Sequence, residues 1–250
     1  MSRWRQQWAW VARTTVCGFL RESRLGGMLV LAMLASAAGW WWRDFNFGSE
    51  EGRFLLNFGL SVQAVGSVVI AVAGVLAVVW REREDGLGQM MQAHGLSGTA
   101  VVFGQWVGIW LVSFVFVIGS AGVIAAMLRI AGHEVPTAQL IWAAVLHGAK
   151  GGVVIAFTLW FAGYARSMVF VVLAAGLMTA LGHLKSLANE IDGLGWWLSR
   201  PVPDLSLLGG GRWMEQGMPM LTGVSHLTYA LGYLLIFGWL AARSYSRREY

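Results

Sequence analysis

Long apolar runs, separated by short polar stretches, make up most of the chain. A transmembrane helix needs about 20 mostly apolar residues to cross a hydrocarbon core about 30 Å thick. The runs are too long and too continuously apolar for the strands of a membrane barrel, which alternate over about 10 residues. We therefore predict an all-α integral membrane protein with six transmembrane helices. These spans are expected at residues 25–42, 57–80, 100–128, 138–164, 167–184 and 223–242.

The composition agrees with a membrane protein. The chain is 57% hydrophobic and 12% charged, whereas a soluble domain has about 45–50% apolar and about 25% charged residues. Because the spans use up most of the 250 residues, we expect a single transmembrane domain over residues 1–250. Arginines interrupt the N-terminus and leave no apolar core before residue 25, so a cleavable signal peptide is not expected. The single Cys17 forms no internal disulfide.

The basic residues predict the orientation, because cytoplasmic loops carry an excess of Lys and Arg. With the N-terminus inside, the inner segments hold eleven of the 18 Lys and Arg residues. We therefore expect a multi-pass protein of the cytoplasmic (inner) membrane, with both termini in the cytoplasm. The net charge of +5 is explained by this topology, so it does not indicate a nucleic-acid partner.

The N-terminal segment, residues 3–24, is amphipathic. Trp4, Trp8 and Val11 recur at helical spacing, with arginines between them. Trp and Arg on such a stretch are typical of a helix that lies in the headgroup region. We expect an interfacial helix; the alternative is an irregular cytoplasmic extension.

The inner segment, residues 81–99, begins with five consecutive ionisable residues, which are Arg81, Glu82, Arg83, Glu84 and Asp85. The spacing of Leu87, Met90 and Met91 then predicts a short amphipathic helix from about 86 to 94. A loop of about four residues would be enough to connect two spans. The longer, charged and structured segment indicates a docking element for a soluble partner. The alternative is a solvated loop whose charges only stop translocation.

The outer segment, residues 185–222, is too apolar for water and too short in its apolar pieces to span the bilayer. It contains Trp196 and Trp197, and then prolines and a glycine run. We expect short re-entrant or interfacial helices on the outer face, buried against protein.

No catalytic or metal site is indicated. The nearest match to a nucleotide-binding loop, around Lys150, lacks the hydroxyl residue and lies in an apolar helix. The five histidines are scattered and no cysteine pair joins them, so no metal site is expected. Ser97 and His226 resemble the dyad of the rhomboid intramembrane proteases. The predicted topology places them about 30 Å apart, which argues against that enzyme.

Two polar residues, His147 and Lys150, lie one helical turn apart in or near the fourth span. A charge at the bilayer centre costs at least about 2.5–3.5 kcal/mol. We therefore favour an outer interfacial segment over residues 138–149, with Lys150 at the true start of the span. The alternative is a central Lys150, which would require a function. In the third span, Gly119, Ser120 and Gly122 predict close helix packing.

Four stretches together match a known family. They are the lead-in "ARTTVCGFLRESRL", "NFGLS" at the start of the second span, the inner segment 81–99, and the close formed by "VPDLSLL" and "RSYSRREY". Over nearly its whole length the chain resembles the six-span permease subunits of ABC-2 type (type V fold) ATP-binding-cassette transporters. It departs from the family at His94–Gly95, where relatives often have Lys-Pro, and at Gln105, where a Lys is common.

The resemblance implies a function. The inner segment would be the coupling helix that docks on a separate soluble ATPase, present in two copies. The implied docking residues are Arg81, Glu82, Arg83, Glu84, Asp85, Leu87, Gln89, Met90, Met91 and His94. Pro203 and Asp204 would lie in an outer helical hairpin, together with Trp196 and Trp197.

The same resemblance implies the partners. A second permease copy or a paralogue would complete the transporter in the lipid bilayer, and spans two and five would line its path. ATP and Mg²⁺ would bind the partner ATPase, so this chain would hold no cofactor and would not be an enzyme. The alternative function is a non-transporting membrane scaffold that recruits a soluble partner. Neither the substrate, nor the direction of transport, nor the choice between homodimer and heterodimer follows from the sequence.

Overall fold

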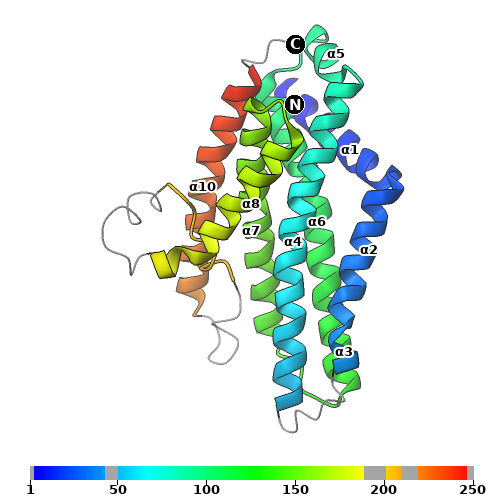
Figure 1. Cartoon of the computed structure of the whole chain (residues 1–250), viewed down its shortest axis with the longest axis vertical. Coiled ribbons are helices and arrows are strands. Elements are labelled where there is room, and N and C mark those ends of the chain that lie inside the picture. Colours follow the sequence, from blue (N-terminus) through cyan, green and yellow to red (C-terminus); the bar gives the residue numbers. More distant parts are fainter. Residues whose placement is uncertain (1–2, 43–49, 189–200, 210–218, 247–250) are drawn as a thin grey trace.

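The computed structural model describes residues 3–42, 50–188, 201–209 and 219–246. Within these residues the chain is helical and contains no strand. The helices are α1 (Arg3–Arg21), α2 (Ser23–Ala37), α3 (Gly39–Trp42), α4 (Glu51–Glu84), α5 (Leu87–Ala93), α6 (Gly98–Ile130), α7 (Thr137–Tyr164), α8 (Met168–Ala188) and α10 (Met220–Ser246). Figure 1 shows the long helices running roughly side by side along the molecule.

The helices confirm a multi-pass membrane protein. Five of them, α4, α6, α7, α8 and α10, are long and apolar enough to cross a bilayer. A sixth span results if α1 and the pair α2 and α3 are counted together as one bent span. The angle between α1 and that pair is 73°. The last five predicted spans therefore each correspond to one helix, and the first predicted span corresponds to α2 and α3.

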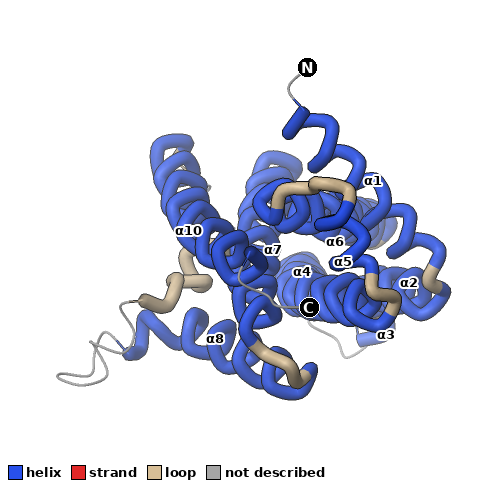
Figure 2. Tube along the Cα trace, turned by 90° about the horizontal axis from the view of Figure 1, so that it is seen from above, coloured by secondary structure: helices blue, strands red, loops and turns tan. Residues whose placement is uncertain are grey.

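The centre of the bundle is formed by α4, α6 and α7. Viewed along the bundle, α1 and α2 lie on one side of these helices, and α8 and α10 lie on the other (Figure 2). Large side chains from the central helices are fully buried, among them Ile70, Phe116 and Phe157. In lipid, helices associate through close packing rather than a hydrophobic driving force.

Small residues make this close packing possible. The hydroxyl oxygens of Ser36 on α2 and Ser120 on α6 are 2.7 Å apart, and both side chains are buried. The neighbouring Gly119 lies against the Met33 side chain. The prediction of close packing around Gly119 and Ser120 is confirmed. A Cβ at Gly122, by contrast, would have no heavy atom within 4 Å.

The N-terminal segment is a regular helix, so the alternative of an irregular extension is wrong. Helix α1 crosses α6 where α6 has two glycines four residues apart. A Cβ at Gly104 would lie 2.6 Å from the Val11 Cβ, and a Cβ at Gly108 would lie 2.7 Å from the Thr15 Cβ. Only glycine leaves room for this approach, so the crossing depends on both positions.

The structure corrects the prediction for the fourth span. Helix α7 continues without a break through residue 150, and Lys150 is only 2% exposed. The glycines around it allow α6 to pack closely, and two indole nitrogens of α6 reach the α7 backbone. Trp110 Nε1 donates to the Gly148 carbonyl at 2.9 Å, and Trp106 Nε1 donates to the Gly152 carbonyl at 2.8 Å. Lys150 is therefore a buried residue in the middle of a span.

The outer segment is described only in part. Trp196 and Trp197 lie outside the described residues, so the helices expected there stay a prediction. Residues 201–209 form turns and bends rather than a helix. Their Leu205 and Leu208 side chains are fully buried, and the Leu205 amide donates to the Gly182 carbonyl of α8 at 2.9 Å. This part of the segment is thus packed into the helix bundle, as its apolar sequence requires.

Candidate functional site

The inner segment lies at one end of the bundle, where α5 meets the start of α6 at Gly98 and the end of α10 at Ser246 (Figure 1). We call this the α5 end. Helix α5 is a short helix between Gly86 and Gly95, whose φ angles are 64° and 70°. Glycine adopts this left-handed conformation without steric cost, which explains the turn at each side. The predicted short helix at 86–94 is confirmed.

Contacts from α1 and α10 fix the position of the loop that carries α5. The Gln7 side chain on α1 donates to the Gly95 carbonyl at 3.1 Å, and the Leu96 amide donates to the Met91 carbonyl at 3.0 Å. A Cβ at Gly98 would lie 3.2 Å from the Tyr245 ring of α10. Elements far apart in the sequence therefore converge on the loop that carries α5.

Glu82 is the centre of a buried hydrogen-bond cluster. Its carboxylate accepts a hydrogen bond from Gln105 Nε2 on α6 at 2.8 Å and one from the Tyr245 hydroxyl on α10. The Glu82 residue is 2% exposed. A buried carboxylate is tolerated only when it is hydrogen-bonded, and here the two donors come from different helices. Glu82 is therefore buried rather than exposed, and its predicted contact with an ATPase stays a prediction.

Arg83 also has an internal role. Its guanidinium donates to the carbonyls of Ala162 at 2.6 Å and Ala165 at 2.9 Å. These carbonyls belong to the C-terminal end of α7, where the helix leaves its last carbonyls without intrahelical donors. The guanidinium also lies 4.7 Å from the centre of the Trp80 ring. Arg83 thus joins α4 to the end of α7, and its predicted docking contact stays a prediction.

Several other side chains of the inner segment are exposed and form a surface. Glu84, Asp85, Met90 and His94 are exposed, and we call these four residues the α5 face. Arg81 is exposed too and pairs with Asp85 at 3.4 Å. Leu87 and Met91 are half-buried beneath the face; Gln89 lies in α5, but its side chain is outside the described part. The face offers acidic and apolar groups together.

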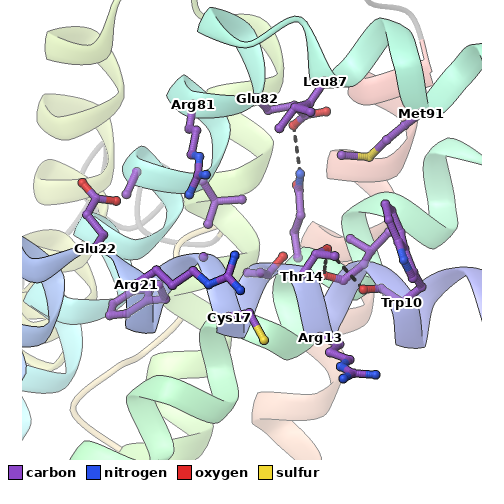
Figure 3. A pocket seen from close by; sticks show the side chains of 17 residues that line it. Trp10, Arg13, Thr14, Cys17, Arg21, Glu22, Arg81, Glu82, Leu87 and Met91 are labelled. Carbon is purple, nitrogen blue, oxygen red and sulfur yellow. Dashed lines mark hydrogen bonds between the residues drawn. The ribbon is translucent and has the colours of Figure 1, made fainter.

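A pocket of about 500 Å³ lies beside this face, between α1, α4 and α5 (Figure 3). Arg13 and Arg21 from α1 and Arg81 from α4 line it, together with Cys17 and Glu82. The Arg81 guanidinium reaches over α1, since a Cβ at Gly18 would lie 3.3 Å from its Nη1. Glu22 lines the pocket too, so a pocket with three arginines and two carboxylates adjoins the α5 face.

Sequence reasoning did not identify the two partners of Glu82. Gln105 carries a signal, because a polar side chain within a span is costly unless it has a partner. Tyr245 carries none, because a tyrosine near the end of the last span is also explained by membrane anchoring. The basic pocket residues of α1 were included only as part of an amphipathic helix.

The pair Ser97 and His226 is not brought together. Ser97 caps the N-terminus of α6, where its hydroxyl accepts from the Ala100 amide at 3.3 Å. It lies next to Gly98, which contacts Tyr245 at the end of α10. The helical rise of 1.5 Å per residue from His226 to Tyr245 places the two ends of that stretch about 28 Å apart. A nucleophile and its base must be within about 3 Å of each other, so this pair does not form a dyad.

The other predicted site residues lie away from the α5 face. His147 and Lys150 are buried in α7. The Asp204 amide donates to the Tyr229 hydroxyl of α10 at 2.6 Å, and the Pro203 carbonyl lies against Gly182 of α8. In the described part of the chain, no group of three or more His, Cys, Asp or Glu side chains is placed to hold a metal ion.

Comparison with known proteins adds no family to this description. Neither the models of protein families nor the curated proteins contain a match to the chain.

Proposed function

We propose that the chain is the membrane-spanning permease subunit of an ABC-2 type ATP-binding-cassette transporter. The observation that carries the proposal is the α5 face. A short helix with exposed acidic and apolar side chains is presented at one end of a membrane bundle, between two glycine turns, and is held from behind by α1. A loop that only connects α4 to α6 needs none of these features.

The proposed topology has six spans. Helices α2 and α3 form the first span, and α1, at 73° to them, lies along the inner membrane surface. The basic residues of α1 and the α5 end support a cytoplasmic position of this end by the positive-inside rule. The chain would then be a multi-pass protein of the inner membrane with both termini in the cytoplasm.

The hydrogen bonds of the α5 end supply a mechanism. A force that a bound ATPase exerts on the α5 face would move the end of α4, because a single turn joins α5 to α4. Glu82 connects this point to α6 and α10, and Arg83 connects it to α7. Closure of an attached ATPase would therefore move four spans together. Such coupled shifts of packed helices are an established mode of conformational switching.

The partners follow from this role. Two copies of a soluble ATPase would bind ATP and Mg²⁺ and supply the energy, and a second permease copy or paralogue would complete the path. This chain would bind no cofactor and catalyse no covalent step. A scaffold that recruits a soluble partner without transport is the alternative use of the same face.

Affinity purification of the tagged chain from native membranes in mild detergent, followed by mass spectrometry, tests the proposal. We expect a soluble protein with a nucleotide-binding loop to co-purify at close to one copy per chain. A stable soluble partner without such a loop would support the scaffold instead. A preparation with no soluble partner would contradict both functions.

A further inference from the structure

A second site lies deeper in the bundle, in a groove between α4 and α8 of about 880 Å³. Valine side chains of α4, such as Val65, Val68 and Val72, form one apolar wall. Lys150 of α7 and His183 of α8 line the same groove, so a cation and a second ionisable group border an otherwise apolar space. None of these residues belongs to the α5 face.

Lys150 differs from the polar residue one turn before it. The His147 ring Nδ1 lies 2.8 Å from the Gln63 Oε1, and the Gln63 amide nitrogen donates to the Val117 carbonyl at 2.7 Å. His147 and Gln63 thus satisfy each other. Lys150 is equally buried at 2% exposure, yet within the described residues it has no hydrogen bond and no ion pair. A buried ammonium group without a partner is strongly unfavourable, and an ionisable residue within a membrane span is a candidate functional residue.

Two charged groups, Lys185 and Asp204, lie close in sequence to the groove-lining residues of α8 and segment 201–209, and both make hydrogen bonds of their own. Lys185 Nζ donates to the Val202 carbonyl at 2.7 Å. Asp204 Oδ1 accepts from the Ser206 amide at 3.0 Å and from the Ser206 hydroxyl at 2.6 Å. No ion pair joins Asp204 to Lys150 in the described structure. The counter-charge for Lys150 is therefore not supplied by either of these groups.

The groove is a built feature of the fold. Leu205, Ser206 and Gly209 close one side of it, and this segment is anchored by the hydrogen bond from the Leu205 amide to Gly182. Leu205 and Leu208 are fully buried, so the wall they belong to is packed against the helices. Thr179 and Ser206 add hydroxyl groups to the border of the groove near His183.

From this arrangement we infer that the groove binds an anionic amphiphile. Its phosphate-type headgroup pairs with Lys150, and its apolar chain lies along the valine wall of α4. Charge complementarity favours an anionic headgroup, because Lys150 has no anionic partner among the described residues, and the apolar wall favours an apolar chain. As a substrate class the inference rests on the proposed transport function; as a binding site it needs no ATPase.

Binding of radiolabelled dodecyl phosphate to the purified chain in maltoside micelles, measured by scintillation proximity against empty micelles, tests the inference. We expect saturable binding to the wild type and to Lys150→Arg, and about tenfold to a hundredfold weaker binding to Lys150→Met, which loses a charge-assisted hydrogen bond. Arg129→Gln is the matched control, because exposed Arg129 lines a groove of similar size, about 830 Å³, between α6 and α7. It should bind like the wild type.

Equal binding to the wild type and Lys150→Met would overturn the inference, as would no saturable binding to a folded wild type. Competition by inorganic phosphate at the same concentration as dodecyl phosphate would show that a free anion occupies the site and would overturn the assignment of an amphiphile. A failure of these tests leaves co-purification of an ATPase unaffected, so the two proposals fail separately.

A labelling experiment locates the bound ligand. In a Cys17→Ser background, Gly176→Cys places a thiol in the groove, where a Cβ has no heavy atom within 4 Å. We expect dodecyl phosphate to slow its reaction with a membrane-permeant maleimide. The control is Gly122→Cys in the α6–α7 groove, whose Cβ position is equally open. Equal slowing of both thiols would show a general effect of the amphiphile and would overturn the site.

Discussion

The side-chain nitrogen of Gln105 lies 2.8 Å from the Glu82 carboxylate, in a buried contact that joins α6 to the end of α4. The Tyr245 hydroxyl of α10 donates to the same carboxylate. One acceptor therefore satisfies donors from two other helices. If it is removed, both donors lose this acceptor inside the bundle, and a buried donor left unsatisfied costs more than the hydrogen bond itself contributes.

Glu82→Ala should therefore destabilise the protein. We expect a loss of about 1–3 kcal/mol for each donor that stays unsatisfied, observed as a lower midpoint of thermal unfolding in detergent. Glu84→Ala is the control, because Glu84 is exposed two residues further on, and such surface changes stay within about 0.5 kcal/mol. Equal midpoints for the two variants would contradict the structural role of Glu82.

Arg83→Met should loosen the end of α7. The variant removes the donors to the Ala162 and Ala165 carbonyls, and hydrogen bonds from a charged group contribute about 1.5–3 kcal/mol. We expect faster amide hydrogen exchange in residues 161–165 by mass spectrometry, with exchange in the middle of α7 unchanged.

Arg81→Met serves as the matched control for that experiment. It removes an exposed arginine whose ion pair with Asp85 is worth at most about 1 kcal/mol. Unchanged exchange at the end of α7 in Arg83→Met, or the same change in both variants, would refute the contact.

Gly108→Leu should displace α1 from α6. A Cβ at this position already lies 2.7 Å from the Thr15 Cβ, and overpacking of this kind costs about 1–3 kcal/mol. We expect faster trypsin cleavage after Arg13, measured by mass spectrometry of the products. Gly122→Leu, on an open part of the same helix, should be cleaved like the wild type. If both variants resist trypsin equally, the close crossing at Gly108 is not required for the position of α1.

Lys150→Met should raise the stability of the protein without ligand. Replacing a buried charge that lacks a partner by an apolar side chain of similar length removes a desolvation cost. We expect a higher midpoint of thermal unfolding than for the wild type, by several degrees. A lower midpoint would show that the Lys150 ammonium makes a stabilising contact.

The spans were predictable because the bilayer imposes their length and apolarity directly on the sequence. The helix α5 was predictable for a similar local reason, since Leu87, Met90 and Met91 repeat at helical spacing within a few residues. These features are local in the chain. The packing of Gly119 and Ser120 followed from residue size alone, because few roles other than close approach use small residues in a span.

The errors concern contacts between distant residues. The run from Arg81 to Asp85 is uniformly charged in the sequence, yet its side chains differ in burial in the structure. Glu82 is buried by Gln105 and Tyr245, which lie 23 and 163 positions away. The sequence predicts Lys150 at the end of a span, because a buried charge is costly and the groove that Lys150 lines is not visible in the sequence. The hydrogen-bond partner and the burial of each charged side chain depend on tertiary packing, which cannot be read from a run of charges.

Because Glu84 and Asp85 are exposed and Glu82 is buried, the docking proposal is tested best with the two exposed acids alone. Reversal of both exposed acids of the α5 face, in the double variant Glu84→Lys with Asp85→Lys, should weaken co-purification of the ATPase more than about tenfold, because like charges placed across an interface cost several kcal/mol. Glu82 is left unchanged, since its reversal would break the buried cluster and confuse loss of docking with loss of folding.

Two comparisons make that result specific. Glu134→Lys reverses an exposed acid in the loop between α6 and α7, at the other end of these helices from α5, and should leave co-purification unchanged. Size-exclusion chromatography of the double variant should show the same elution volume as the wild type, since both acids are exposed. If the correctly folded double variant retained the ATPase at wild-type levels, the α5 face would not be the docking surface. The pocket lined by Arg13, Arg21 and Arg81 would then be the next surface to change, because it also carries charged side chains at the α5 end.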